Sequence, residues 1–172
     1  RDIQVLSPMH RGIVGAANLN RTLQQRLNPS AQQLVRGTHS LRHNDKIMQM
    51  RNNYDKEVYN GDIGTISRID VAAATVPVRF DGREVCYDAG ELDEVSQAYA
   101  VSVHKAQGSE FPAVVVPVLT QHYTMLERNL LYTAVTRGRR LVVLVGTTKA
   151  LTLAVKNASQ RRRYTALVAR LR

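Results

Sequence analysis

The change of hydrophobic period along the chain constrains its fold more than any other feature. Two apolar runs, at residues 114–118 and 141–145, carry no polar face, which is typical of strands covered on both faces of a parallel sheet. Between residues 45 and 95 the pattern changes to short alternating strands with hairpin dipeptides at Asn60-Gly61 and Asp81-Gly82. The chain is therefore predicted to be an α/β protein with a mostly parallel sheet and helices on both faces, interrupted by a small antiparallel β-barrel.

The same periodicity predicts the individual elements. A strand is expected at residues 3–6, followed by a loop at residues 7–12 and a helix that stops at Asn28-Pro29. The other expected elements are barrel strands at 63–66, 76–80 and 85–87, core strands at 98–103, 114–118 and 141–145, and helices at about 124–135, 148–157 and around 161–171. The predicted domain division assigns residues 1–45 and 95–172 to the α/β domain and residues 46–94 to the barrel.

Composition limits the class of protein. Of the 172 residues, 44% are hydrophobic and 22% are charged, which is ordinary for a globular protein. No apolar run is long enough for a membrane span, no signal peptide opens the chain, and the first residue, Arg1, leads directly into a strand. The single cysteine, Cys86, excludes an internal disulfide and a cysteine-based zinc site. We expect a fragment of a longer cytoplasmic protein with no membrane partner.

The charge of the chain indicates the kind of partner. A formal net charge of +10 and a pI near 10.3 favour a polyanion, and nucleic acid before a membrane surface. A solubilising charge, or a surface that neutralises an acidic neighbouring domain, is the alternative. With no Trp and only two Phe, a platform of aromatic side chains for base stacking is weakly supported.

Three polar loops are candidates for a ligand site. Residues 7–12, 104–110 and 136–140 are expected at the carboxyl ends of the parallel strands, where open α/β sheets bind ligands. The chain contains no GxxxxGK[ST] phosphate-binding loop, no acidic strand end that offers a magnesium ligand, and no cluster with metal-ligand spacing. It can contribute to a nucleotide site but cannot build one alone.

Four segments, in this order along the chain, resemble those of one family. VLSPMHRGIVGAANLN (residues 5–20), NNYDKEVYNGDIG (52–64), AYAVSVHKAQGSEF (98–111) and LLYTAVTRGRRLVVLVG (130–146) are similar to motif IV, the start of the SH3-like insert, motif V and motif VI of RecD-like superfamily 1 helicases, of the type that acts without RecB and RecC. The resemblance covers nearly the whole chain. It implies a second RecA-like motor domain (2A) that carries an SH3-like subdomain (2B).

The resemblance also implies roles for single residues. Arg137 matches the motif VI arginine finger, which would reach the γ-phosphate of ATP, and Arg11 matches a motif IV basic position that would face the same phosphates. The nucleotide side of motif V is assigned to Gln107, Gly108 and Glu110. For each, an ordinary surface arginine or turn residue is the alternative.

The start of motif V is assigned to DNA. Ser102, His104 and Lys105 offer hydroxyl, imidazole and ammonium donors for DNA phosphates, although a strand-end histidine with a local hydrogen bond is the alternative for His104. Asn52, Asn53 and Tyr54 are expected to fasten the insert to the α/β core rather than to contact DNA. Arg139 and Arg140 are expected to be surface charges near the end of a helix.

These assignments predict the C-terminal half of an ATP-dependent 5′ to 3′ DNA helicase, inactive by itself. ATP and Mg²⁺ would be bound mainly by an upstream RecA-like domain of the same polypeptide, and single-stranded DNA would be the partner of a monomer. A non-catalytic basic module for nucleic acid, with a decayed nucleotide site, is the alternative. A third hypothesis, a barrel that binds Pro-rich ligands, would need an aromatic groove from Tyr54, Tyr59, Phe80 and Tyr87.

Overall fold

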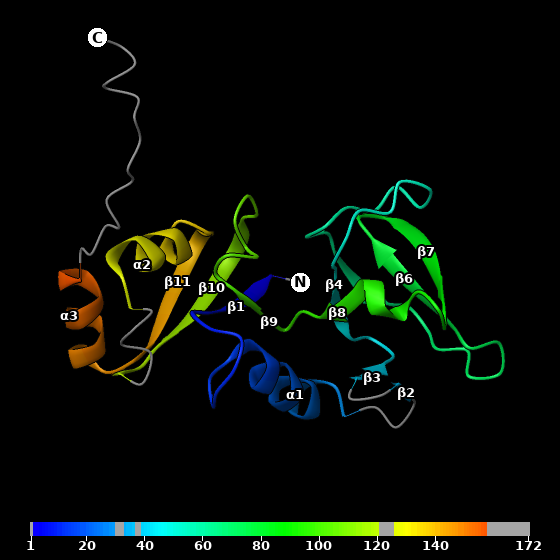
Figure 1. Cartoon of the computed structure of the whole chain (residues 1–172), viewed down its shortest axis with the longest axis horizontal. Helices are drawn as coiled ribbons and strands as arrows, with labels where there is room; N and C mark the ends of the chain where they lie inside the picture. Colours follow the sequence, from blue (N-terminus) through cyan, green and yellow to red (C-terminus); the bar gives the residue numbers. More distant parts are fainter. Residues whose placement is uncertain (1, 30–32, 37–38, 121–125, 158–172) are drawn as a thin grey trace, which may run out of the picture.

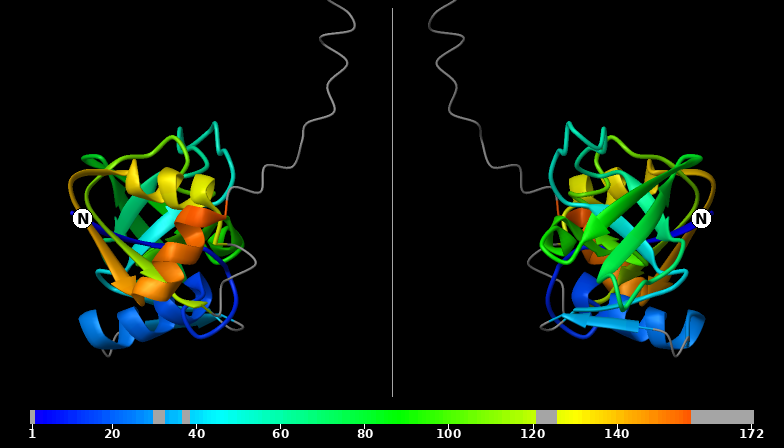
Figure 2. Two further views of the ribbon diagram at one scale, coloured as in Figure 1. Left: turned by 90° about the vertical axis from the view of Figure 1, so that its left-hand side faces the viewer. Right: turned by 90° about the vertical axis from the view of Figure 1, so that its right-hand side faces the viewer.

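The chain folds into a parallel sheet and an antiparallel sheet, which lie side by side in a computed structural model (Figure 1). The structure describes residues 2–29, 33–36, 39–120 and 126–157. Helices α2 (Arg128–Val135) and α3 (Thr148–Lys156) lie at one end of the molecule and the antiparallel sheet lies at the other (Figure 1), and the two views of Figure 2 look at the molecule from these ends. The helix expected around residues 161–171 lies outside the described residues.

The parallel sheet has four strands in the order β11-β10-β1-β9. They are β1 (Ile3–Ser7), β9 (Ala100–Ser102), β10 (Phe111–Val118) and β11 (Gly138–Gly146), and every neighbouring pair is parallel. The predicted α/β class with a mostly parallel sheet is therefore confirmed.

Helices cover this sheet unequally. Ala134 of α2 and Ala150 and Ala154 of α3 are buried in one apolar core with alternate residues of β10, among them Val114 and Val116. Helix α1 (Ala16–Leu27) lies at the other end of the sheet, beside β9. There Asn20 satisfies the outer edge of β9, because its side chain accepts from Ala100 N–H and donates to Ala100 C=O, both at 2.8 Å.

The antiparallel sheet has five strands in the order β7-β6-β5-β4-β8. The strands are β4 (Lys46–Gln49), β5 (Ile63–Ile66), β6 (Thr75–Phe80), β7 (Arg83–Asp88) and β8 (Val95–Gln97), with a short 3₁₀ helix at Leu92–Glu94. Alternate side chains of these strands fill a separate core around Tyr87. At the β6–β7 hairpin, Asp81 and Gly82 both have positive φ, +34° and +94°, as the predicted two-residue turn requires.

A short hairpin was not predicted. Strands β2 (Gln33–Arg36) and β3 (His39–Arg42) pair between α1 and β4, and Leu34 and Leu41 pack into the core of the antiparallel sheet. The expected strand at residues 98–103 is shorter than predicted, because β9 begins only at Ala100 and β8 before it belongs to the antiparallel sheet.

The prediction that residues 141–145 form a buried strand is wrong. Strand β11 is at the edge of the sheet, and Leu141 and Val145 are 54% and 52% exposed. Their register partners on β10, Ala113 and Pro117, share that face of the sheet. An apolar run predicts a strand whose two faces are covered, but it does not show that residues of this chain provide the cover.

Candidate nucleotide and nucleic-acid site

Arg137 lies between the end of α2 and the start of β11, next to the loop that precedes β10. Its backbone C=O accepts from Phe111 N–H at 2.8 Å, which joins the two segments. Its guanidinium donates from Nε to Thr133 C=O at 3.2 Å, from Nη1 to Ser109 C=O at 3.1 Å, and from Nη2 to Thr136 Oγ1 at 3.2 Å. The three acceptors fix the plane of the guanidinium.

These contacts leave part of the guanidinium available. An arginine has five N–H donors, one on Nε and two on each Nη. Three of the donors of Arg137 are used, so one on each Nη has no acceptor among the described residues. Guanidinium donors that remain on both Nη atoms are groups that can bind phosphate oxygens.

Glu110 pairs with Arg139 rather than with Arg137. Glu110 Oε2 accepts from Arg139 Nε at 2.7 Å, and both side chains are more than half exposed. The hydrogen bond from Arg139, together with its charge, lowers the pKa of Glu110 below its ordinary range. Arg139 is therefore not an isolated surface charge, since it holds a carboxylate at the same edge of the sheet as Arg137.

The loop from residue 103 to residue 110 runs between opposite ends of the parallel strands. It leaves the carboxyl end of β9 at Ser102 and reaches the amino end of β10 at Phe111, through successive turns. One of these turns has Gly108 at φ +86°, a left-handed conformation that glycine adopts without the steric cost of a Cβ. Gln107 and Gly108 are exposed on this loop.

The first half of the loop faces the antiparallel sheet across a groove of about 640 Å³, here called the loop groove. Its lining residues are Met48, Met50, Asn60, Gly61, Asp62, His104, Lys105, Gln107, Gly108 and Ser109. His104 is exposed, and Lys105 lies across the groove with its Nζ 3.3 Å from Met50 Sδ. Ser102 Oγ accepts from Lys105 N–H at 3.3 Å, so this hydroxyl supports the turn.

Arg11 does not join Arg137. It follows the carboxyl end of β1, whereas Arg137 precedes the amino end of β11, and all the strands between them are parallel. The eight residues of β10 separate the two ends of the strands by about 23 Å, at about 3.3 Å per residue. The structure therefore does not bring the two arginines together, and the prediction that residues 136–140 lie at carboxyl ends of strands is wrong.

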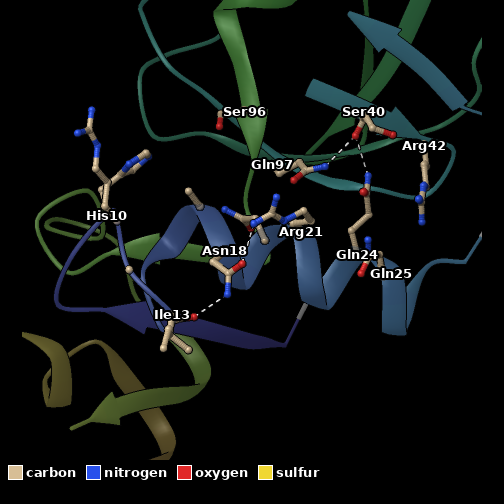
Figure 3. Close-up of a pocket in the computed structure, with 14 residues that line it drawn as sticks. His10, Ile13, Asn18, Arg21, Gln24, Gln25, Ser40, Arg42, Ser96 and Gln97 are labelled. Atoms are coloured by element: carbon tan, nitrogen blue, oxygen red, sulfur yellow. Dashed lines mark hydrogen bonds between the residues drawn. The ribbon is translucent and has the colours of Figure 1, made fainter. Parts of the chain in front are cut away.

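Arg11 instead lines a second groove, the α1 groove, which lies between α1 and the strands β3 and β8 (Figure 3). The residues that line it are His10, Arg11, Gly12, Ile13, Ala17, Asn18, Asn20, Arg21, Gln24, Gln25, Ser40, Arg42, Ser96 and Gln97. Sequence reasoning missed this groove, because its residues are distributed over four segments and only the first of them, the segment that resembles motif IV, carries a motif. The available signal was the set of exposed polar positions on the helix after residue 12.

The residues that follow β4 brace their own loop. Asn53 donates to Glu94 Oε2 at 3.0 Å, and Asn52 accepts from Asn60 N–H at 2.9 Å. Both partners belong to the antiparallel part of the chain, so the prediction that these residues fasten the insert to the α/β core is wrong. Tyr54 is 72% exposed and makes an edge contact with Tyr59, with ring centroids 6.1 Å apart.

Phe80 and Tyr87 are buried in the core of the antiparallel sheet. Two of the four aromatic residues considered for a Pro-rich ligand are therefore not on the surface, and this hypothesis loses its groove. Within the described part of the chain, no group of three or more His, Cys, Asp or Glu residues is placed to hold a metal ion. Nor does any described helix have the length and hydropathy needed to cross a bilayer.

Two family models match the chain. A model described as the UvrD-like helicase C-terminal domain matches residues 97–145, and one described as the ATP-dependent RecD-like DNA helicase SH3 domain matches residues 19–80. The first match contains the loop from 103 to 110 and Arg137. The second begins within α1 and ends with β6.

Among curated proteins, the ATP-dependent RecD2 DNA helicase of Deinococcus radiodurans is 38% identical over 171 residues, which cover 99% of this chain and 23% of that protein. The RecD subunit of the RecBCD enzyme from Mycolicibacterium smegmatis is 30% identical over 169 residues, which cover 98% of this chain and 29% of that protein. The chain thus spans about a quarter of the length of these relatives.

The fold is also found in solved structures at low sequence identity. Pif1 from Bacteroides bound to single-stranded DNA superposes with a TM-score of 0.58 and 16% identity, over 87% of this chain and 44% of that one. Pif1 helicase from Candida albicans superposes with a TM-score of 0.56 and 16% identity, over 98% of this chain and 50% of that one. At this identity the similarity establishes the fold alone.

Proposed function

The chain belongs to the RecD-like branch of the superfamily 1 helicases, and we propose on this basis that it is the C-terminal motor part of an ATP-dependent DNA helicase. Residues 1–45 and 98–172 form the second motor domain in this proposal, and residues 46–97 form its SH3-like subdomain, because β8 pairs with β4 in the antiparallel sheet. The phosphate-binding loop and the Mg²⁺ ligands belong to an upstream motor domain, since the chain has no GxxxxGK[ST] segment.

The observation that carries the proposal is the guanidinium of Arg137. It is held by three acceptors and keeps one donor on each Nη for a ligand. A planar, permanent cation in this state stabilises the charge that develops on a transferring phosphoryl group, at no cost of reorganisation. Gly108 and Glu110 lie at the same edge of the sheet and form the rest of this half of the ATP site. Arg11 has no part in it.

Single-stranded DNA is proposed to follow the loop groove, where His104 and Lys105 bind its backbone, and to extend to Ser102 beside the groove. Exposed imidazole and ammonium groups suit phosphate oxygens. The Bacteroides Pif1 structure with single-stranded DNA, which shares the fold, supports this substrate class. Movement in the 5′ to 3′ direction and a monomeric state complete the proposal, and a strand-displacement assay with 5′-tailed and 3′-tailed duplexes tests the direction.

The test of the ATP site is Arg137→Ala in the intact enzyme. ATP binding is expected to stay within a few-fold, because the phosphate-binding loop of the other domain makes most ground-state contacts. DNA-stimulated turnover is expected to fall by ~10³ or more, the scale on which an arginine finger acts. Arg137→Lys is expected to recover little of this loss, since a point charge on a flexible stem lacks the fork of the guanidinium.

Arg140→Ala is the matched control, because Arg140 is exposed and no contact of its side chain is found among the described residues. Arg139→Ala cannot serve, since it releases Glu110. An Arg137→Ala enzyme with normal turnover and an unchanged unfolding temperature would refute the assignment of the arginine finger.

A basic module for nucleic acid without catalysis is the second candidate, favoured by the net charge of +10. The two candidates differ in the intact protein, because a decayed site gives DNA binding without DNA-dependent ATP hydrolysis. In both cases the 172-residue chain alone is expected to hydrolyse no ATP and to bind DNA weakly, with log affinity falling linearly with log salt.

A further inference from the structure

The α1 groove is a second hollow of the surface, partly lined by the segment that resembles motif IV, and the comparisons assign no ligand to it. It has a volume of about 890 Å³ and is bounded by α1 on one side and by β3 and β8 on the other (Figure 3). It shares no lining residue with the loop groove. A ligand of the α1 groove therefore makes contacts that are additional to those of Ser102, His104 and Lys105.

The charge of the α1 groove is of one sign. Arg11, Arg21 and Arg42 line it together with His10, and its described lining contains no Asp or Glu. The nearby carboxylate of Asp45 is fully buried, accepts four hydrogen bonds from uncharged donors and does not line the groove. A groove lined by one sign of charge concentrates the field and attracts anions.

The arginines of the groove have donors to spare. Arg21 is exposed, and its one contact among the described residues is from Nη2 to Asn18 Oδ1 at 2.8 Å. Arg42 donates from Nη1 to Asn28 C=O at 2.9 Å, and its Nε is buried, so only its Nη groups remain as donors for a ligand of the groove. Arg11 is exposed and has no side-chain contact within the described part of the chain. Unused guanidinium donors are the groups that bind phosphate oxygens in pairs.

The shape and the remaining side chains indicate which polyanion fits. Asn18, Arg21 and Gln25 stand at i, i+3 and i+7 on one face of α1, a distance of about 10 Å at about 1.5 Å per residue. A face of this length matches several units of an extended polyanion rather than a single phosphate group. The described lining contains amides but no Phe, Tyr or Trp, so contacts to the DNA backbone are expected to dominate over base stacking.

We propose that the α1 groove binds the sugar–phosphate backbone of single-stranded DNA, as a second contact region separate from the loop groove. The proposal rests on the proposed function in one respect, namely that DNA is the substrate of the intact enzyme. Recognition is by charge and amide donors, and it is independent of base sequence.

The experiment measures the affinity of the intact enzyme for oligothymidylate and oligodeoxyadenylate by fluorescence anisotropy at several salt concentrations. Arg21→Gln removes one groove cation, and Gln25→Glu places a negative charge on the same face. The matched control is Arg26→Gln, because Arg26 is an exposed arginine of α1 that does not line the groove. Each phosphate contact to a single strand contributes about 0.7 to the slope of log affinity against log salt.

Arg21→Gln is expected to reduce this slope by about 0.7, so that its affinity relative to wild type changes by about 2.6-fold between 50 and 200 mM salt. Gln25→Glu is expected to weaken binding of both oligonucleotides equally, and Arg26→Gln to leave the slope unchanged. An unchanged slope in Arg21→Gln overturns the proposal. So does an equal change in Arg26→Gln, which would show an effect of general charge only.

Competition by a polyglutamate peptide tests the alternative that the α1 groove binds an acidic protein segment instead of DNA. If the peptide binds wild type but not Arg21→Gln, while DNA binds both equally, the groove is a site for acidic protein segments and the proposal is wrong. Failure here is distinguishable from failure of the helicase proposal, which is decided by DNA-stimulated turnover in Arg137→Ala.

Discussion

Asp45 is the buried junction between the two sheets, and replacing it tests how they are held together. Its side chain is fully buried and accepts four hydrogen bonds. Oδ2 accepts from Gln24 Nε2 at 2.6 Å and from Arg42 N–H at 2.8 Å. Oδ1 accepts from Asn28 Nδ2 at 2.8 Å and from the Tyr99 hydroxyl at 2.9 Å. The donors come from α1, the β2–β3 hairpin and the segment that leads into β9.

The cost of Asp45→Ala follows from what happens to these donors. Gln24 Nε2 and Asn28 Nδ2 each keep a backbone acceptor, Ser40 C=O and His43 C=O, at 2.7 Å. Arg42 N–H and the Tyr99 hydroxyl donate to no other acceptor among the described residues. Each buried donor left without a partner costs about 1–3 kcal/mol, so the free energy of unfolding should fall by about 2–6 kcal/mol.

Asp45→Asn should cost about half as much. With its NH₂ group in the place of Oδ1, the amide keeps an oxygen for Gln24 and Arg42, and the Tyr99 hydroxyl can rotate to accept instead of donating. Asn28 Nδ2 then faces a donor and keeps only His43 C=O, which accounts for the remaining cost. Equilibrium urea unfolding of the chain, followed by circular dichroism, measures both variants. Asp55→Asn is the control, since Asp55 is exposed and should stay within about 0.5 kcal/mol. If Asp45→Ala lost no more stability than this control, the junction would contribute nothing and the reasoning would be refuted.

Three further predictions concern single contacts. Burial, and then the Asp45 carboxylate, raise the pKa of Tyr99 above its ordinary value of 10.0. The unfolded chain therefore releases this proton at lower pH than the folded chain, and the free energy of unfolding should fall above about pH 10. Tyr99→Phe should remove part of this decrease, as measured by urea unfolding at several pH values. A Cβ on Gly64 would lie 2.6 Å from Val78 Cγ1, so Gly64→Ala should destabilise by about 1–3 kcal/mol, whereas Gly90→Ala, with open space around its Cβ, should not; equal melting temperatures would contradict this. Arg139→Ala should return the pKa of Glu110 towards its ordinary value of 4.5, which a carboxyl NMR titration can follow, and an unmoved pKa would mean that the ion pair does not form in solution.

The periodic elements could be predicted from the sequence because each strand or helix carries its own pattern. Residues 3–6 were predicted as a strand and form most of β1, and the helix stop at Asn28-Pro29 coincides with the end of α1 at Leu27. Asn60 and Gly61 were expected to form a turn, and Gly61 has φ +101° within the longer loop between β4 and β5. Local chemistry suffices at all these places.

The rest depends on which segments meet, and a single sequence does not contain that information. Asp45 lies in no motif, and its four donors lie 3 to 54 positions away along the chain. The α1 groove is likewise formed by α1 and by the strands β3 and β8, which are distant from α1 in the sequence or belong to another sheet. Arg11 was assigned to the ATP site by motif, but only the parallel register of β1, β10 and β11 shows that it lies at the far edge from Arg137.

That separation of edges gives the loop from residue 103 to residue 110 a specific place in the proposed mechanism. Its first residue, Val103, donates its N–H to Ser7 C=O at 3.0 Å, at the carboxyl edge where the proposed DNA contacts begin. Near its other end, Ser109 C=O accepts from Arg137 at the amino edge, where the proposed ATP site lies. A shift of Arg137 towards a phosphate therefore acts directly on the backbone that carries Gln107, Lys105 and His104. In the proposed helicase, this one covalent segment couples the ATP side to the DNA side.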